Sequence, residues 1–292
     1  MLGKDYMIKF KVPATSANIG PGFDCFGLAF SFCNEYQVEK SNKMFIEGCD
    51  PVFNNKNNEF NKAFNATMKI LNKKGSYHLY EIPKIPSSRG LGSSASVIVA
   101  GCKTANILYG NNKLTNEDIF NISTKIEGHP DNVAAAIFGG LTASVRLNNG
   151  KYYCKKYKVS NKLYFTALIP DFKTQTQIAR KLLPQKYAKN DVISTISHSI
   201  LMVEALKSGD FNLLKTVCKD CIHEPYRKKL IKDYDNIKKI VEKNGDAVLL
   251  ISGSGPTLLA ISSNANFSKN LILKNTKATW TIKPVKIKKG GI

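Results

Sequence analysis

The chain has 292 residues, of which 43% are hydrophobic, and its 43 basic and 22 acidic residues give a net charge of +21. That length and apolar content suit one large globular domain or two ordinary ones with packed cores. No stretch of eighteen uninterrupted apolar residues occurs and charges stand among the first ten residues, so we expect neither a membrane span nor a signal peptide, and a cytoplasmic location.

Apolar periodicity predicts the elements of the first half of the chain. Ile8, Phe10 and Val12 alternate with lysine and predict a first strand, which a loop over 13–27 follows. Thr115 and Asp118 form a capping-box pattern that starts a helix. In chain order we expect strands at 35–40, 44–49 and 77–82, helices at 58–74, 93–109 and 115–126, and a β-hairpin made of 141–147 and 151–159.

The second half mixes strands and helices without regular alternation. We expect strands at 163–169, 247–252, 257–262 and 279–287, and helices at 174–183, 192–207, 211–222 and 226–243. Irregular mixing of this kind favours two α+β domains over a doubly wound sheet. We expect the first domain at 1–158 and the second at 159–292.

Seven cysteines are spread along the chain. An odd number without a secretion signal predicts free thiols and not a disulfide framework. Cys218 and Cys221 form a single C-x-x-C pattern inside an expected helix, with only His223 close by. A zinc site needs more ligands, so we interpret the pair as packing residues.

The net charge of +21 raises the alternative of a nucleic-acid-binding module. The lysines are nevertheless scattered among many asparagines, and the tail 269–292, with seven lysines and no acidic residue, is the one local cluster. We therefore expect no nucleic-acid partner, although the positive field favours a polyanionic substrate such as a nucleotide.

Three glycine- and serine-rich loops lie at expected element junctions, at 13–24, 87–95 and 252–257. Such loops are either surface turns or phosphate cradles made of backbone N–H groups and a helix N-terminus. The P-loop pattern does not occur. The string GLGSSA fits a dinucleotide fingerprint, but Pro83 and Pro86 interrupt the strand-to-loop junction, and no acidic residue stands about twenty residues further on, so a different cradle is indicated.

Together with the string EGHPDN, these loops resemble the GHMP small-molecule kinases over nearly the full length of the chain. The segments that carry the resemblance are VPATSANIGPGFDCFGLA (12–29), PSSRGLGSSAS (86–96), EGHPDNVAAAIFGG (127–140), QIARKLLP (177–184), EPYRKKLI (224–231) and SGSGPTLLA (252–260). The third segment and the two arginine segments are similar to those of the homoserine kinases within this family. Ala135 departs from the pattern, because the family often has proline there.

The resemblance implies a two-domain α+β fold, with an N-terminal domain like ribosomal protein S5 domain 2 and a ferredoxin-like C-terminal domain. It implies an ATP- and Mg²⁺-dependent kinase that phosphorylates the hydroxyl of L-homoserine in threonine biosynthesis. Another GHMP kinase, acting on a mevalonate-type or sugar-type alcohol, is the alternative. Small molecules, not nucleic acid or membrane, are the expected partners, and a homodimer is left open.

The resemblance also implies roles for single residues. The phosphates of ATP would bind at Pro86, Ser87, Ser88, Arg89, Gly90, Leu91, Gly92, Ser93, Ser94, Ala95 and Ser96. Ser94 and Glu127 would hold Mg²⁺, since a hydroxyl and a carboxylate suit this hard ion, and with Asn132 they would form the catalytic group. Homoserine would bind at Asn18, Asp24, His129, Arg180, Arg227, Gly253 and Gly255.

The charges of homoserine agree with the implied roles of three residues. Its carboxylate matches the planar donors of Arg180 and Arg227, and its ammonium matches the carboxylate of Asp24. Without the resemblance, the two arginines could equally be exposed residues of amphipathic helices, and Asp24 could equally stabilise a turn. Asp24 and Asp131 are the nearest candidates for a catalytic base, but the resemblance implies that the hydroxyl proton leaves late toward the phosphate oxygens.

Overall fold

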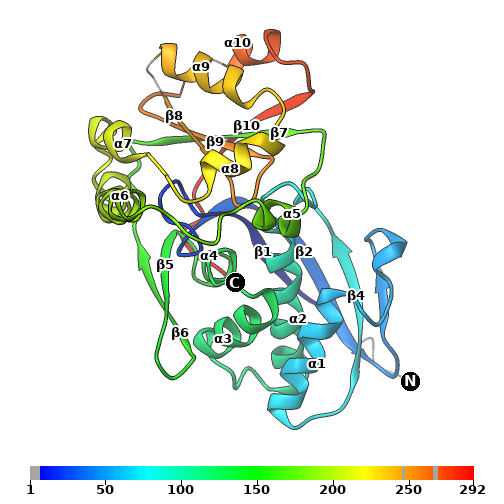
Figure 1. The fold of residues 1–292 in the computed structure, drawn as a ribbon. Helices are drawn as coiled ribbons and strands as arrows, with labels where there is room; N and C mark the ends of the chain where they lie inside the picture. Colours follow the sequence, from blue (N-terminus) through cyan, green and yellow to red (C-terminus); the bar gives the residue numbers. More distant parts are fainter. Residues whose placement is uncertain (1–6, 245–246, 266–268) are drawn as a thin grey trace.

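Two β-sheets with helices packed on them make up the structure (Figure 1). The computed structural model describes residues 7–244, 247–265 and 269–292. Within these ranges no helix is long and apolar enough to cross a bilayer. The mixture of helices and sheets confirms the predicted α+β class.

The first sheet has the strand order β3-β4-β2-β5-β6, and β1 also pairs with β2. Its strands are β1 (Ile8–Ala17), β2 (Phe26–Ser41), β3 (Phe45–Glu47), β4 (Ser76–Ile82), β5 (Leu141–Arg146) and β6 (Tyr152–Tyr157). Its helices are α1 (Glu59–Leu71), α2 (Ser93–Tyr109), α3 (Asn116–Glu127) and α4 (Asp131–Phe138), with the short helix η1 (Pro51–Phe53) between β3 and α1. The helices α1 to α4 lie together on one face of the sheet, where Val12, Tyr36, Phe64, Ile98 and Phe120 are buried (Figure 1).

The second sheet is antiparallel, with the order β10-β7-β9-β8. Its strands are β7 (Tyr164–Pro170), β8 (Ala247–Ile251), β9 (Leu258–Ser262) and β10 (Trp280–Val285). The helices of this half are α5 (Thr176–Lys181), α6 (Lys189–Ser208), α7 (Phe211–Val217), α8 (Glu224–Arg227), η2 (Lys228–Leu230), α9 (Tyr234–Asn244) and α10 (Lys269–Lys274). In Figure 1, α9 and α10 lie above this sheet, and Ile237, Val241, Leu249 and Trp280 are buried between them and the strands.

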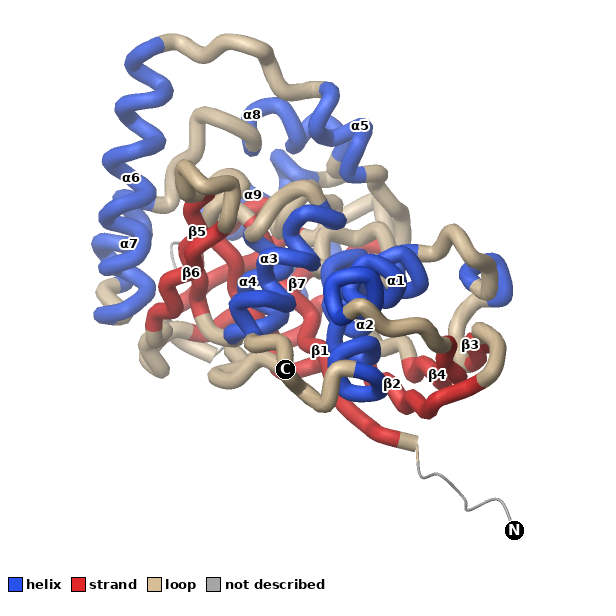
Figure 2. Tube along the Cα trace, turned by 90° about the horizontal axis from the view of Figure 1, so that it is seen from below, coloured by secondary structure: helices blue, strands red, loops and turns tan. Residues whose placement is uncertain are grey.

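A shared apolar core joins the two halves. It contains Ala14 and Leu28 from the first sheet, Phe165 and Leu259 from the second, and Met202 from α6. The tube view in Figure 2 shows α6 and α7 side by side at one flank of the molecule. Because this core holds β1, β2 and the second sheet together, the loops at the ends of these strands are brought to one junction.

The last residues of the chain return to the first sheet. Ser31 N donates to Lys286 O at 2.8 Å, and Lys288 N donates to Ala29 O at 2.9 Å. Residues beyond β10 therefore pair with β2 although they belong to the second half of the sequence. The expected division at 158/159 stays a prediction.

Two local predictions agree closely with the structure. The helix expected at 93–109 is α2, with the same limits. The capping box that starts α3 is formed: Asp118 N donates to Thr115 Oγ1 at 3.1 Å, and Thr115 N donates to Asp118 Oδ2 at 2.9 Å. Both elements depend on contacts within a few residues, which a sequence pattern encodes directly.

Several predicted boundaries in the first half were wrong. The strand expected at 35–40 begins much earlier, because β2 runs from Phe26 to Ser41. The first strand does not end at Pro13, because β1 continues to Ala17 after an irregularity between Pro13 and Thr15, and its pairing with β2 extends to Ala17 and Gly27. The loop expected at 13–27 is therefore shorter. The helix expected at 58–74 ends earlier, at Leu71, because Asn72 takes a left-handed conformation and forms its C-cap. The short helix α4 is an addition to the expected elements.

The helices expected at 211–222 and 226–243 are also interrupted. α7 ends at Val217, so the prediction that Cys218 and Cys221 lie in a helix was wrong. Asp220 Oδ2 accepts from His223 N at 2.7 Å and from Glu224 N at 2.8 Å, and these bonds start the separate helix α8. A second break falls at Asp233, whose φ is 63° and whose carboxylate accepts from the backbone at Lys277 and Ala278. Aspartate side chains that bind backbone N–H groups thus divide one apolar pattern.

Candidate active site

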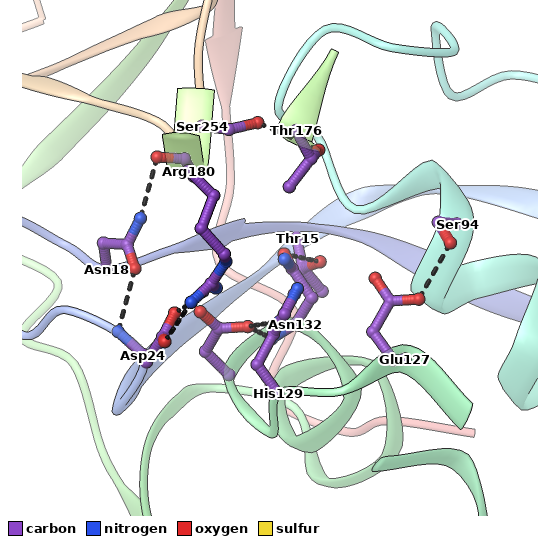
Figure 3. A network of polar contacts seen from close by, with 12 residues as sticks. Thr15, Asn18, Asp24, Ser94, Glu127, His129, Asn132, Thr176, Arg180 and Ser254 are labelled. Carbon is purple, nitrogen blue, oxygen red and sulfur yellow. Dashed lines mark hydrogen bonds and ion pairs between the residues drawn. The ribbon is translucent and has the colours of Figure 1, made fainter. Parts of the chain in front are cut away.

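A cavity of about 710 Å³ lies at the junction of the two halves. Lining residues come from the loops after β1 and β8, from the loop before α2, from the α3–α4 connection and from α5. Others come from β2, β3, β4, η1 and α1. Figure 3 shows the polar contacts at and beside this space. Segments from both ends of the sequence therefore meet in one cavity.

The loop before α2 is held closely by neighbouring backbone. Gly90 and Gly92 have φ values of 70° and 68°. A Cβ atom at Gly90 would collide with Ser252 O, and one at Gly92 would collide with Thr15 Oγ1. Glycine is therefore needed at both positions for conformation and for space.

The N-terminus of α2 opens into the same cavity. α2 runs for 17 residues from Ser93, and its N-cap is Gly92, which has no side chain to bind the first N–H groups. These N–H groups and the positive end of the helix dipole are suited to an anion such as phosphate. Arg89 anchors the loop from the other side, since its Nε donates to Pro170 O at 2.9 Å and its Nη2 to Asp171 O at 2.8 Å.

Ser94 and Glu127 meet across the cavity. Ser94 Oγ donates to Glu127 Oε2 at 2.8 Å (Figure 3). The pKa of Glu127 is raised, because the effect of burial exceeds the opposing effects of the charge on His129 and of the Ser94 hydroxyl. In the described ranges no group of three or more His, Cys, Asp and Glu side chains is arranged to hold a metal. A hydroxyl beside one carboxylate instead fits Mg²⁺, which keeps several waters and takes other ligands from phosphate.

A buried carboxylate organises the start of α4. Asp131 Oδ1 accepts from Asn132 N at 2.6 Å and lies 2.9 Å from His129 Nδ1. Burial lowers the pKa of His129, but the hydrogen bond and charge of Asp131 outweigh it and raise the pKa to about 9. Thr15 Oγ1 donates to Asn132 Oδ1 at 2.8 Å. The site therefore contains an imidazolium at neutral pH and an amide held in one orientation.

Asp24 and Arg180 form a bidentate ion pair at the other side of the cavity. Arg180 Nη1 donates to Asp24 Oδ2 and Arg180 Nη2 donates to Asp24 Oδ1, both at 2.8 Å (Figure 3). Asn18 supports this loop, because its Oδ1 accepts from Asp24 N at 3.0 Å and its Nδ2 donates to Gly253 O at 2.7 Å. Two residues predicted to bind opposite charges of a substrate thus bind each other.

Arg227 is a buried cation with incomplete partners. Its side chain lines the cavity and the residue is only 2% exposed. Nη1 donates to Gly253 O at 3.0 Å, whereas Nε has no hydrogen-bond partner among the described residues. Burial and the charge of Arg180 lower the pKa of Arg227. A buried guanidinium with an unused donor is suited to bind an anion that enters the cavity.

The structure brings most of the predicted site residues to this cavity. Those that line it are Asn18, Asp24, Ser87, Ser88, Arg89, Gly90, Leu91, Gly92, Ser93, Ser94, Glu127, His129, Asn132, Arg180, Arg227 and Gly253. Four do not line it, namely Pro86, Ala95, Ser96 and Gly255. Ser96 lies in the interior, where its Oγ is 3.0 Å from the hydroxyl of Tyr36.

Sequence reasoning missed one contact beside the cavity and one part of its lining. Thr15 stands inside a quoted motif, but only the fold shows that it binds Asn132. At the end of the cavity away from the ion pair, the lining comes from Asn34, Ile46, Phe53, Phe60, Leu79, Glu81 and Ile85. These residues belong to separate strands and helices, and each fits an ordinary core or surface pattern, so no signal in the sequence groups them.

Family models and similar proteins identify the family of this chain. The GHMP kinases N terminal domain matches residues 58–140, and the GHMP kinases C terminal domain matches 202–276. The homoserine kinase of Clostridium botulinum (strain ATCC 19397 / Type A) is 41% identical over 291 residues, covering 98% of this chain and 97% of the relative. The homoserine kinase of Clostridium kluyveri is 41% identical over 264 residues, covering 87% and 86%.

Solved structures show the same fold over the whole chain. The crystal structure of homoserine kinase from Cytophaga hutchinsonii ATCC 33406 has a TM-score of 0.87 and 27% identity, and it covers 100% of this chain and 98% of its own. The L. major mevalonate kinase, at 18% identity and a TM-score of 0.69 over 98% and 97%, shares the fold. The chain therefore belongs to the GHMP kinase family and, within it, to the homoserine kinases.

Proposed function

We propose that this kinase transfers the γ-phosphoryl group of ATP to the side-chain hydroxyl of L-homoserine, a step that serves threonine biosynthesis. The observation that carries the proposal is one continuous cavity with an anion cradle at α2 and opposite charges at Asp24, Arg180 and Arg227. The names of the curated relatives support the same substrate. A small molecule with a positive charge, a negative charge and a hydroxyl could bind these charged side chains and extend its hydroxyl toward the anion cradle.

The phosphate chain of ATP would lie on the loop 86–92 and the first turn of α2. Backbone N–H groups supply directed donors there, and the two glycines let them approach closely. Ser94 and Glu127 would hold Mg²⁺, which when bound would neutralise part of the phosphate charge. Glu127 must then be ionised, and the positive His129 favours that state.

The apolar end of the cavity is proposed to take the adenine base. Ile46, Phe53 and Leu79 supply apolar surface there, and Asn34 and Glu81 supply polar edges. This end lies beside the start of the loop that would bind the phosphates, since Asn34 Oδ1 accepts from Lys84 N and Ile85 N at 2.8 and 2.9 Å. A base placed here would direct its phosphates toward α2.

Homoserine would bind with its carboxylate on Arg227 and Arg180 and its ammonium on Asp24 and Asn18. Arg227 has an unused donor, and Arg180 is half-exposed and so can turn from Asp24 to the substrate. Each charge of the zwitterion then replaces one partner in an existing ion pair. The exchange leaves no charged group unpaired, which keeps the desolvation cost of binding low.

The carboxylates nearest to the proposed acceptor are already engaged. Asp24 is bound by Arg180 and, after the exchange of partners, would bind the substrate ammonium, while Asp131 is bound by His129 and by Asn132 N. We therefore propose that the hydroxyl proton passes late to a phosphate oxygen, as suits a loose transition state that depends on positioning. Asn132, held by Thr15, would orient the hydroxyl or the γ-phosphate.

The alternative substrates match the charges less well. A neutral sugar would leave Arg227 without an anion, and an unpaired buried polar group costs about 1–3 kcal/mol, more when it is charged. A mevalonate-type acid would satisfy the arginines but place no cation on Asp24. We also propose a cytoplasmic enzyme without nucleic-acid or membrane partners; a homodimer stays an open alternative.

A coupled ADP-release assay over several alcohols tests the proposal. L-Homoserine, mevalonate, galactose and shikimate are each added with ATP and Mg²⁺ to the full chain. We expect ADP release with homoserine at least about a hundredfold faster than with the other three, because only homoserine pairs both charges. Release with mevalonate but not with homoserine would overturn the substrate and leave the family intact.

A further inference from the structure

We infer that Phe23 is a positioning residue that holds the guanidinium groups of Arg180 and Arg227 side by side as a clamp for the substrate carboxylate. Phe23 does not line the cavity, so it would act through the arginines and not on the substrate. The inference rests on the proposed function, because it concerns the carboxylate site of the same substrate.

The ring of Phe23 contacts both cations. Arg227 Cζ lies 5.1 Å from the ring centroid, and Arg180 Cζ lies 5.5 Å from it. Both distances fall within the range in which the ring quadrupole attracts a cation, about 6 Å. One aromatic side chain is therefore shared by two arginines that are 47 residues apart in the chain, at positions 180 and 227.

Such a shared contact is needed because the two guanidinium groups repel each other. The charge of Arg180 is one of the causes that lower the pKa of Arg227. The buried Arg227 cannot move away, but the side chain of Arg180 is 43% exposed and can turn into solvent. Attraction to the ring of Phe23 opposes that movement.

Phe23 precedes Asp24, and the two neighbours bind different parts of Arg180. The ring contacts the central carbon of the guanidinium, while the carboxylate binds its two terminal nitrogens. When a substrate carboxylate replaces Asp24 as the partner of Arg180, the contact with the ring remains available. Arg180 can then change its partner without leaving the vicinity of Arg227.

The other neighbour of the ring adds no positive charge. His223 stacks on Phe23 with centroids 5.4 Å apart and an interplanar angle of 25°. Its Nε2 donates to Gly20 O at 3.0 Å, and burial lowers its pKa although Asp220 opposes this. Stacking on this imidazole, whose pKa is lowered, helps to fix the ring without placing another cation on it.

Three variants test the inference. Phe23→Leu removes the aromatic ring and keeps an apolar side chain, whereas Phe23→Tyr keeps the ring. Phe211→Leu is the matched control, because Phe211 carries Lys215 over its ring at 5.3 Å on α7, outside the cavity. The assays measure kcat and KM for ATP, for L-homoserine, and for 3-amino-1-propanol, which is homoserine without its carboxylate.

We expect Phe23→Leu to raise KM for homoserine about three- to tenfold, with kcat and the KM for ATP within about twofold of the unchanged chain. Phe23→Leu should have the same activity on 3-amino-1-propanol as the unchanged chain, since that alcohol has no carboxylate for the clamp. Phe23→Tyr and Phe211→Leu should both keep the original KM. An unchanged homoserine KM in Phe23→Leu, or equal losses on both alcohols, would overturn the inference.

Calorimetric titration of L-homoserine without ATP separates this inference from the proposed function. If the unchanged chain binds homoserine but does not phosphorylate it, the proposed function fails. The Phe23 inference is then decided by the dissociation constant alone, which Phe23→Leu should raise by the same factor and Phe23→Tyr should leave unchanged. If the unchanged chain does not bind homoserine, both fail.

Discussion

Arg180 and Asp24, which are 156 residues apart in the sequence, form a bidentate ion pair in which both N–O distances are 2.8 Å. The pair joins α5 to the loop after β1 at the edge of the cavity. Its two members are the residues proposed to bind the opposite charges of homoserine. The protein alone thus contains a charge arrangement that complements the zwitterion, and substrate binding becomes an exchange of partners.

Replacing Asp24 distinguishes a binding role from a catalytic one. In Asp24→Asn the ammonium of homoserine loses its carboxylate, so KM should rise about tenfold or more while kcat stays within about threefold. Steady-state kinetics at saturating ATP measures both values. Asp235→Asn is the control, because Asp235 forms an exposed ion pair with Lys228. A collapse of kcat with an unchanged KM would instead identify Asp24 as the base.

Glu127 should control the use of Mg²⁺. Glu127→Gln keeps the size of the side chain but removes the charge proposed to hold the ion, so kcat should fall about a hundredfold or more and the half-saturating Mg²⁺ concentration should rise. A Mg²⁺ titration at fixed ATP measures this. Glu117→Gln, an exposed position in the first turn of the same helix, should behave like the unchanged chain. Normal Mg²⁺ dependence in Glu127→Gln would refute the assignment.

The loop before α2 should not accept a side chain at Gly92. Gly92→Ala adds strain at a positive φ and a collision with Thr15 Oγ1, so the free energy of unfolding should fall by about 2–4 kcal/mol and ATP should bind more weakly. Gly150→Ala has a φ of 78° but open space around its Cβ, so only strain of about 1 kcal/mol is expected there. Urea unfolding compares the two variants, and equal losses would contradict the close fit.

Glu224 should make stability depend on pH. Burial raises its pKa to about 7, above the ordinary value near 4.5, so the folded chain favours the protonated form. The group lowers stability progressively as pH rises from about 4.5 to 7, because the unfolded chain ionises first. Glu224→Gln, which keeps an oxygen for Ile251 N, should match the unchanged chain at pH 4.5 and exceed it by about 2 kcal/mol at pH 8.

Urea unfolding at several pH values checks this expectation. Glu204→Gln is the control, since Glu204 is exposed and paired with Lys207 on α6. A difference between Glu224→Gln and the unchanged chain that does not vary with pH would show that the pKa of Glu224 is the same in the folded and the unfolded chain.

Local features of the fold and site followed from the sequence. The limits of α2 and the capping box of Thr115 depend on neighbouring residues, and the glycine loops with the Ser94 and Glu127 segments form recognisable motifs. The breaks at Asp220 and Asp233 did not follow, because apolar periodicity does not report where a side chain binds backbone N–H groups.

Contacts between distant segments were the other limit. The family resemblance assigned Asp24 and Arg180 to one substrate but gave no sign that they bind each other. The role of Phe23 and the apolar end of the cavity likewise depend on residues from several elements that meet only in the folded chain. These contacts form because the shared core holds the two sheets together, and no single sequence motif encodes that core.

The most direct test of the central claim is a phosphorus NMR spectrum of the full chain with ATP, Mg²⁺ and L-homoserine. Transfer to the side-chain hydroxyl predicts a new phosphomonoester signal, split into a triplet by the two protons of the adjacent methylene group. The signal should be missing when either Mg²⁺ or homoserine is left out, and it should grow with the ADP signals. Loss of ATP to inorganic phosphate alone, with no phosphomonoester, would contradict the account.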